Sequence, residues 1–371
     1  MTHPLIESLK KNNINLDKIT NQQNLNYKKY GNLAIFKYNK NAKYGTNLQR
    51  LSRGIIIDLE TNKLLCSSFS GSLSMDQFIK NVPVNNCVIE ENIEGTLINL
   101  YFYNKIWRIS TKFSINADET KFKSNKTFRQ LFDSIIDINI LKNLDKNFTY
   151  SFVLVHEDLR LVTPVSENKI YHIETTNNIT GEKIRTNIGI PHPKIILSGN
   201  KYIADNANIE TFESYDEILT KLSQLIWSLR GFMLYSIDRN YHCSLINPAY
   251  DLVKNLVANQ SDKKYICLNS LFYKKNNNEI LKYFPEYNDI FVNVLKDYNN
   301  LKQTAYKFYL DKKCFKKDIN VPLKYNKLLF DIHGEYLKTK NINKKFKVTI
   351  DNVDSILRNY ECPYLFTLLY K

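Results

Sequence analysis

The residues best suited to chemistry lie in the stretch from Val88 to Ser114, which begins with a short charged loop that ends at Gly95 and contains Glu91-Asn92-Ile93-Glu94. Two alternating apolar runs follow it, from Thr96 to Tyr103 and from Ile106 to Lys112, and Asn104-Lys105 between them has turn chemistry. The sequence therefore predicts a loop followed by a β-hairpin. A carboxamide nitrogen has no basic lone pair, so the Asn92 side chain cannot serve as a nucleophile.

This stretch resembles motif I of the phage-type ATP-dependent RNA ligases, the tRNA-repair RNA ligase 1 family, whose pattern is Glu-Lys-x-Asp-Gly-Ser-Leu. In that family the lysine attacks the α-phosphate of ATP to form a phosphoramidate, and the glycine lets the backbone pass close to the nucleotide. Asn92 stands at the lysine position, whereas Glu94 and Gly95 match the structural part of the motif. The resemblance implies descent from a ligase without its adenylate-carrying amine.

Further motifs of the same family follow in the family's order between about Leu33 and Tyr250. Arg53-Gly54 matches an Arg-Gly pair that opens a strand, Gly231 matches the glycine of motif IV, and Tyr250 ends motif V. Wherever the family places a lysine or glutamate that handles phosphate or metal, the resemblance aligns a residue without that group. These degenerate positions are Gln77, Asn92, Ser244 and Ile246 for lysines, and Val153 and Arg230 for glutamates.

Phosphoryl transfer of this kind needs lysines on the phosphates, carboxylates that hold Mg²⁺ and a nucleophile. The resemblance therefore implies no functional catalytic residue, no metal site and no cofactor, whereas active members of the family use ATP and Mg²⁺. Arg230 would also repel a cation at the former carboxylate position. The basic residues that remain are candidates for holding phosphate or RNA, namely Arg53, Lys112, His156, Arg160 and Arg230.

The charge balance favours a polyanionic partner. The 371 residues carry 52 Lys and Arg against 37 Asp and Glu, a formal net charge of +15, which fits RNA or DNA. The alternative is that AT-rich coding DNA has enriched lysine, asparagine, isoleucine and tyrosine while leaving only 10 glycines. Basic charge forms a binding footprint only where it gathers on one face.

Neither a metal-binding nor a membrane-associated class is indicated. The six cysteines are far apart and contain no Cys-x-x-Cys pair, which argues against a zinc knuckle and a disulfide framework. The N-terminus lacks the pattern of a signal peptide, and no apolar run approaches the ~20 residues that span a bilayer. We expect no membrane partner and a reducing, cytoplasmic location.

The expected fold class is α+β. Residues 1–255 are expected to form an RNA ligase-like nucleotidyltransferase domain, an ATP-grasp-like adenylation fold with antiparallel sheets, and residues 256–371 an all-helical C-terminal domain that binds RNA. The alternative for the second domain is a solvated helical face with core tyrosines. Strands are expected over residues 33–38, 51–58, 64–69, 147–155, 170–174 and 231–235. Helices are expected over 114–131, 218–229, 278–284, 287–310, 323–339 and 351–358, with Ser114 or Asn116 capping the first and Asp351 the last.

The favoured function is a catalytically lapsed ligase-like protein that binds RNA, specifically tRNA or its anticodon arm, and shields it from a nuclease in an immunity or anti-toxin role. The gene is expected to lie in the genome of a virus or in a cytoplasmic plasmid. One alternative is an active or partial RNA ligase that uses a relocated lysine, such as Lys80, Lys105 or Lys112, or performs only the sealing step. Another is a non-catalytic scaffold that joins a protein partner in RNA processing and exposes a large apolar patch.

Overall fold

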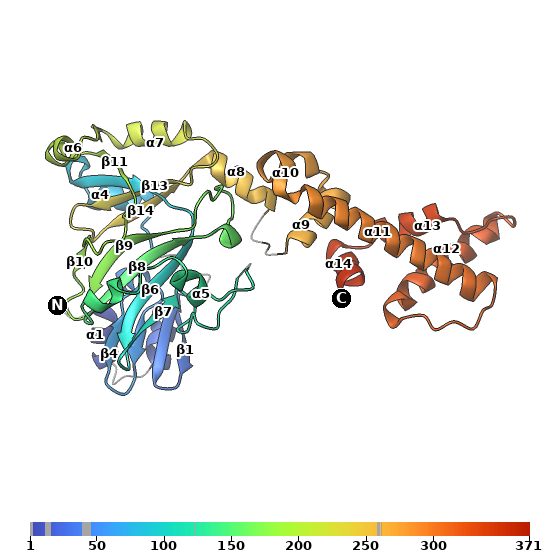
Figure 1. Ribbon diagram of the computed structural model, residues 1–371, viewed down its shortest axis with the longest axis horizontal. Helices are drawn as coiled ribbons and strands as arrows, with labels where there is room; N and C mark the ends of the chain where they lie inside the picture. The colour runs from blue at the N-terminus through green and yellow to red at the C-terminus, as the bar shows by residue number, and fades with distance from the viewer. Residues whose placement is uncertain (1–2, 12–15, 39–45, 123, 258–259, 261) are drawn as a thin grey trace. The chain divides into compact units, whose positions relative to one another are not determined.

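The computed structural model describes residues 3–11, 16–38, 46–122, 124–257, 260 and 262–371. The chain divides into two compact units, Met1–Lys254 and Asn255–Lys371. We call the first the sheet unit, because it contains the β-sheets, and the second the helical unit, because all its described elements are helices (Figure 1). The expected α+β class is confirmed. Within the described ranges, no helix is both long and apolar enough to cross a membrane.

Three sheets, largely antiparallel as expected, build the sheet unit. Their strands are β1 (Leu25–Tyr30), β2 (Leu33–Tyr38), β3 (Ile56–Asp58), β4 (Lys63–Cys66), β5 (Cys87–Glu91), β6 (Thr96–Tyr103), β7 (Ile106–Thr111), β8 (Phe148–Val155), β9 (Lys169–Asn177), β10 (Lys183–Ile184), β11 (Ile195–Ser198), β12 (Glu210–Thr211), β13 (Gly231–Ser236) and β14 (His242–Ile246). The N-terminal sheet has the order β1-β2-β3-β4. The "β8 sheet" has the order β10-β9-β8-β6-β7, and the "β5 sheet" has the order β12-β11-β5-β13-β14, with β11 and β12 parallel.

Helices cover one face of each larger sheet. On the β5 sheet, α4 (Met75–Asn81) and α7 (Tyr215–Ser223) bury Phe78 and Ile218 against strand residues such as Ile89. On the β8 sheet, α5 (Phe128–Asp133) packs Phe132 against Phe152. The remaining helices of this unit are α1 (Pro4–Lys11), α2 (Leu16–Gln23), α3 (Asn47–Leu51), α6 (Lys201–Ala207) and α8 (Pro248–Val257), the last of which crosses the boundary to the helical unit.

The opposite faces of the two sheets meet in a separate apolar cluster. Val153 follows Phe152 on β8, and because side chains alternate along a strand, it faces away from α5. There it joins Ile173 of β9 and Tyr235 of β13. The loop of residues 92–95 connects β5 to β6 and so passes from one sheet to the other beside this cluster.

The helical unit is arranged around one long helix, α11 (Asn288–Tyr309). Its buried residues recur every three or four positions, as expected for a helix with one apolar stripe; they are Phe291, Val294, Tyr298, Leu301, Ala305 and Tyr309. Around it lie α9 (Lys263–Asn269), α10 (Asn277–Tyr283), α12 (Asn326–Ile342), α13 (Ile350–Arg358) and α14 (Cys362–Tyr370).

The expected hairpin is confirmed as β6 and β7, and Asn104 and Lys105 both take positive φ values of 50° and 63°, as a two-residue hairpin turn requires. The expected helix over 114–131 is wrong, because only α5 forms there and its cap is Thr127. The hydroxyl groups of Ser114 and Thr120 donate to the Asn116 carbonyl, and such local bonds compete with helix formation.

Other expectations needed smaller corrections. The helix expected over 218–229 ends at Ser223, and Thr349 rather than Asp351 caps α13. The strand expected over 51–58 is reduced to β3, because the preceding residues end α3 and turn at Gly54, where φ is +74°. The sequence patterns did not predict β1, α9 or α14.

Candidate functional site

A cavity of about 760 Å³ lies at the point where the loop between β5 and β6 passes between the sheets. Its lining comes from β1, β6, β8, β13, β14 and the segments around β5 and β7. We call it the loop cavity. The structure places in its wall seven positions singled out from the sequence: Arg53, Asn92, Gly95, Lys112, Val153, Arg230 and Ser244.

Two positions that the resemblance aligns with lysines meet directly in this cavity. The Nδ2 atom of Asn92 donates a hydrogen bond to the Oγ atom of Ser244 over 2.9 Å. Asn92 is held in place by its backbone N–H, which donates to the Gly231 carbonyl, and Ser244 pairs with Met233 across β13 and β14. A neutral amide bonded to a hydroxyl group thus forms this part of the cavity wall.

Three cations converge on the same cavity. Burial, followed by the charges of Arg53 and Arg230, lowers the pKa of Lys112 from 10.5 to about 8. Arg230 donates from Nη1 to the Ile93 carbonyl over 3.3 Å, and the buried Nε of Arg53 has no hydrogen-bond partner among the described residues. Each of these features indicates positive charge that an anion would stabilise.

Charge distinguishes the loop cavity from its larger neighbour. Lys28, Arg53, Lys112, Lys121 and Arg230 line the loop cavity, and Glu91 is the acidic residue among its described lining. The neighbouring cavity, of about 1200 Å³, also has five basic residues in its wall but sets four glutamates against them. The smaller cavity is therefore the better site for a polyanion.

Four other predicted positions lie outside the lining of the loop cavity. Gln77 is exposed and completes the capping box of α4 with Ser74, and Ile246 pairs with Gly231 at the end of β14. His156 is buried, and its Nδ1 accepts the N–H of Asp158. Arg160 donates from Nε to the Val162 carbonyl. Local hydrogen bonds hold the last two, so they are weaker phosphate-binding candidates than the cavity cations.

The residues predicted to be structural hold the loop in place. The Glu94 carboxylate accepts the backbone N–H groups of Leu161, Val162 and Thr163 over 2.7–3.0 Å. Burial and the neighbouring Glu94 raise the pKa of Tyr250.

Close packing or a positive φ favours glycine at three of the motif positions. At Gly231, where φ is +134°, an added Cβ would lie 2.1 Å from the Leu245 carbonyl oxygen. At Gly54 it would lie 3.0 Å from the Lys112 Cα, so Gly54 positions that lysine. Gly95 is similarly confined beside Leu154.

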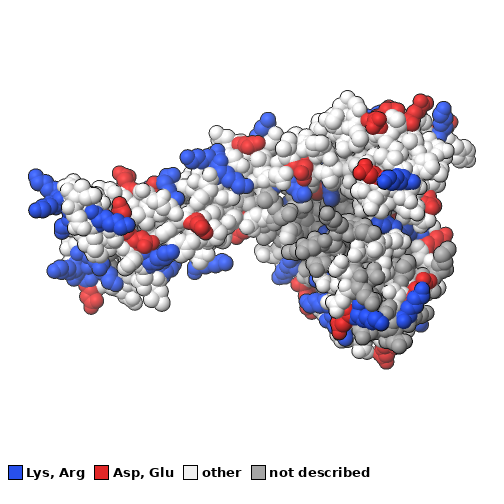
Figure 2. Space-filling model, turned by 180° about the vertical axis from the view of Figure 1, so that it is seen from behind, with Lys and Arg blue, Asp and Glu red and all other residues white. Residues whose placement is uncertain are grey.

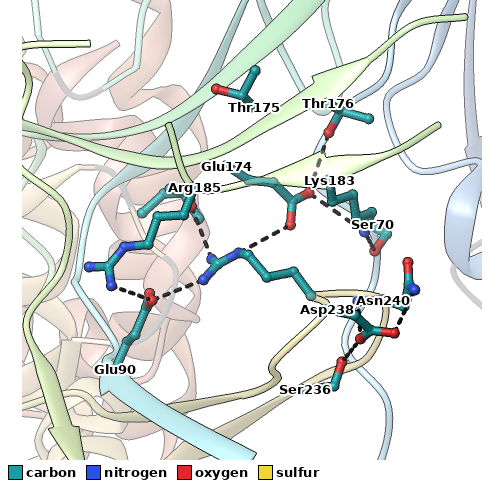
Figure 3. Close-up of polar contacts among 12 residues, drawn as sticks. Ser70, Glu90, Glu174, Thr175, Thr176, Lys183, Arg185, Ser236, Asp238 and Asn240 are labelled. Carbon is teal, nitrogen blue, oxygen red and sulfur yellow. Dashed lines mark hydrogen bonds and ion pairs between the residues drawn. The ribbon is translucent and has the colours of Figure 1, made fainter. Parts of the chain in front are cut away.

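A largely buried ionic network, which the sequence patterns did not reveal, connects strands of the two larger sheets (Figure 3). Arg239, in the turn between β13 and β14, contacts Glu90 over 2.9 Å and Glu174 of β9 over 3.8 Å. Arg185 lies 3.4 Å from Glu90, and Lys183 lies 3.5 Å from Glu174. Since 149 positions separate Arg239 from Glu90, no local spacing could have indicated this pairing.

Metal-binding groups are not apparent. The described part of the chain contains no cluster of three or more His, Cys, Asp or Glu side chains placed to hold an ion. Arg230, at a position where the resembling ligases have a glutamate, also puts positive charge beside the loop.

Sequence comparison finds several viral relatives. The chain is 25% identical over 230 residues to a candidate bifunctional polynucleotide kinase/RNA ligase of Autographa californica nuclear polyhedrosis virus, covering 56% of this chain and 31% of that protein. It is 33% identical over 91 residues to the RNA ligase of Rhodothermus phage RM378, covering 22% and 20%. It is 31% identical over 107 residues to the immediate-early protein ICP-46 homolog of Invertebrate iridescent virus 3, covering 26% and 24%. The chain thus spans less than a third of the length of these relatives.

No protein-family model matches the chain. Among solved structures, an archaeal ATP-dependent RNA ligase aligns at 8% sequence identity and a TM-score of 0.40, over 76% of this chain and 77% of that chain.

Proposed function

We propose that this chain, which belongs to the RNA ligase family, has lost nucleotidyl transfer and binds RNA. The main support for this proposal is the loop cavity. There Asn92 donates a hydrogen bond to Ser244, and the described lining contains five basic residues and one acidic residue. An amide cannot form the phosphoramidate that starts ligation. The remaining cations can still hold phosphate groups without chemistry.

The helical unit supplies further positive charge. Residues 255–371 contain 21 Lys and Arg against 12 Asp and Glu, a net charge of +9. On the face shown in Figure 2, basic side chains are prominent over this unit, at the left of the view. The Tyr309 hydroxyl oxygen lies 3.3 Å from the Nδ1 atom of His333, and the centres of the Tyr336 and Phe346 rings are 6.3 Å apart. These contacts bring together three lysine-rich segments, which are residues 312–317, 338–340 and 344–347. We call this the basic end; its exposed lysines are Lys312, Lys313, Lys316, Lys317, Lys338, Lys340, Lys344, Lys345 and Lys347.

The RNA that we propose is a tRNA or its anticodon arm, because its phosphates suit the basic end and its unpaired loop nucleotides suit the cavity of the sheet unit, each unit considered by itself. Binding there would shield the anticodon loop from a nuclease, in an immunity or anti-toxin role. Nuclease footprinting of bound tRNA tests this: protection confined to the anticodon arm is expected, and uniform or absent protection contradicts it.

Two measurements test the general proposal. Incubation with labelled ATP and Mg²⁺ should leave the protein unlabelled, and Asn92→Lys alone should not restore labelling, because Arg230, Ser244 and Ile246 remain. RNA affinity should fall steeply with salt, by a slope of about 0.7–0.9 per phosphate contacted. Absence of RNA binding would favour a scaffold, for which Leu323, Phe330 and Leu337, exposed at seven-residue spacing, offer an apolar face.

A second candidate function is an active ligase in which Lys112 replaces the lost nucleophile. Its lowered pKa, about 8, and its place in the same cavity as Asn92 favour it. The Nζ atom would attack the α-phosphorus of ATP, forming an N–P bond as the P–O bond to pyrophosphate breaks. Protein labelling lost in Lys112→Ala but kept in Lys80→Ala and Lys105→Ala, which remove exposed lysines outside the cavity lining, would establish this candidate and overturn the first.

A further inference from the structure

The helical unit exposes a row of large apolar side chains along α12. Leu323 lies in the short turn of helix that precedes α12, and Phe330 and Leu337 follow at intervals of seven residues, so all three share one side of the helix. Their exposed fractions are 85%, 77% and 51%, whereas α12 buries other residues on its opposite side. We call these three side chains the apolar row. Large apolar groups exposed together are typical of a binding surface.

Gly334 makes a notch in the apolar row. It lies four positions after Phe330 and three before Leu337, so it shares their side of the helix. A Cβ atom added there would meet no described atom within 4 Å outside the backbone of its own helix. Glycine inside a helix lowers stability relative to alanine, and no described neighbour requires it at this position. A notch between two large side chains suits a side chain of a second helix that packs along the row.

Positive charge borders the apolar row, whereas the two carboxylates of α12 point elsewhere. Lys338 and Lys340 are exposed, lie on either side of the row near Leu337, and belong to the basic end. Asp331 accepts a hydrogen bond over 2.6 Å from the hydroxyl group of the tyrosine that follows α13. Glu335 stands two positions before Leu337, so it projects from another side of the helix. A segment that covers the row therefore meets lysines at its edges.

We propose that the apolar row binds an amphipathic helix of a partner protein, whose apolar face is bordered by aspartate or glutamate. Apolar side chains of the partner pack against the row, one of them enters the notch at Gly334, and its carboxylates pair with Lys338 and Lys340. This inference goes beyond RNA binding and does not depend on it.

Two other occupants fit the row less well. A second copy of this chain would bring its own lysines against Lys338 and Lys340, and like charges repel. RNA would leave Leu323 and Leu337 without a suitable partner, because phosphates need cations and bases stack on aromatic or guanidinium planes rather than on leucine. A helix with an acidic border matches both the apolar side chains and the lysines.

The test uses the full chain and three synthetic peptides of about 20 residues, a length that can form a helix by itself. The first peptide has leucines at helical spacing with glutamates beside them. The second replaces these glutamates by lysines, and the third has the composition of the first in scrambled order. Titration of labelled peptide with protein gives the affinity. The glutamate peptide should bind about 10-fold or more tightly than either of the others.

Substitutions locate the binding. Phe330→Ser and Leu337→Ser should each weaken binding of the glutamate peptide by about 10-fold to 100-fold. Gly334→Gln should also weaken it by filling the notch, yet should raise the midpoint of denaturant unfolding, because glutamine is the better helix former. Lys338→Glu should reduce the preference for glutamate over lysine peptide by about 5-fold. Val292→Ser is the matched control, because it removes an apolar side chain that is 57% exposed on α11 and lies outside the row.

Circular dichroism of every variant checks that the fold is intact. No binding of the glutamate peptide to the wild type, or equal binding to the wild type and the folded row variants, would overturn the inference. A wild-type dimer that Phe330→Ser dissociates, measured by sedimentation, would assign the row to a second copy instead. Affinity for tRNA that falls in Phe330→Ser and Leu337→Ser, but not in Val292→Ser, would assign the row to RNA and overturn the inference as well.

Discussion

Two groups of basic side chains in the sheet unit differ in how their charge is compensated. In the buried network, Arg185, Arg239 and Lys183 face two carboxylates, Glu90 and Glu174. In the loop cavity, Arg53, Lys112 and Arg230 share the wall with Glu91 alone among acidic residues of the described lining. Tyr235 lies at the boundary, since it lines the cavity while its ring centre is 3.9 Å from the Arg239 guanidinium.

The difference teaches what each group does. Buried charge is costly unless it is paired, so the compensated network is a structural joint. It links β5 and the turn before β14 to β9 and β10, and thereby joins the two sheets that wall the cavity. Among the described residues no carboxylate forms an ion pair with Arg53, Lys112 or Arg230, which is the arrangement expected of a site for an anion.

The largest effect is expected when the ionic network loses the Glu90 carboxylate. Glu90→Gln should lower the free energy of unfolding by about 3–5 kcal/mol, because it removes the counter-charge of the buried Arg239 and of the partly exposed Arg185. Chemical denaturation measures this, with the exposed Glu213→Gln as a control expected to change stability by less than ~0.5 kcal/mol. A loss for Glu90→Gln as small as that of the control would show that the network is not structural.

The next test concerns the Glu94 carboxylate, which holds the cavity loop through backbone N–H groups. Glu94→Gln removes one of two acceptor oxygens that serve three backbone N–H groups, and should cost about 1–3 kcal/mol. Denaturation gives the value, and hydrogen exchange at Val162 and Thr163 locates it. Unchanged exchange at these amides would contradict the assigned role.

The uncompensated group should make the opposite contribution. Because the folded-state pKa of Lys112 is lowered to about 8 from 10.5, the folded state disfavours its charged form. Lys112→Met should therefore be more stable than the wild type at neutral pH, by ~1–2 kcal/mol after allowing for the partial exposure of the side chain. The advantage should disappear as pH rises from 8 to 10.5, where the wild-type lysine loses its proton. A gap independent of pH across this window would indicate an apolar packing effect instead.

The smallest expected effect is stabilisation by a bound anion, which should depend on the cations of the loop cavity and not on those of the ionic network. Pyrophosphate at a few times its dissociation constant should stabilise the wild type by up to about 1 kcal/mol in thermal unfolding, since it binds the folded state. Arg53→Gln should lose this stabilisation, whereas the network variant Lys183→Met should retain it. Equal loss in both variants would show that the two groups of cations do not act separately.

The strands that frame the cavity were predictable, because alternation and turn chemistry are local signals; β6, β7, β8 and β13 illustrate this. The family resemblance implies that Asn92, Val153, Arg230, Ser244 and Ile246 share one cleft, which no local pattern indicates. The first four line the loop cavity, and Ile246 does not. The resemblance aligns Gln77 with a motif lysine. In the structure, the Gln77 side chain instead forms the capping box of α4 with Ser74. The roles of all these residues in binding stay predictions.

The rest depended on long-range contacts. The segment after Lys112 has helix-like spacing, but side-chain bonds from Ser114 and Thr120 hold it in an irregular path that brings Phe113 to the cavity. The network around Arg239 unites residues from both sheets, and charges spread over 149 positions give no signal before the sheets are assembled.

The three amide hydrogens that converge on Glu94 have a consequence for how such a protein can change over time. They attach the main chain of residues 161–163 to the Glu94 carboxylate, and these contacts do not involve the side chains of Asn92 or Arg230. Substitutions can therefore replace the side chains that line the loop cavity, one after another, while the backbone around the cavity keeps its conformation. Laboratory evolution of this chain would therefore start from an intact cavity backbone and would vary only the side chains that line it.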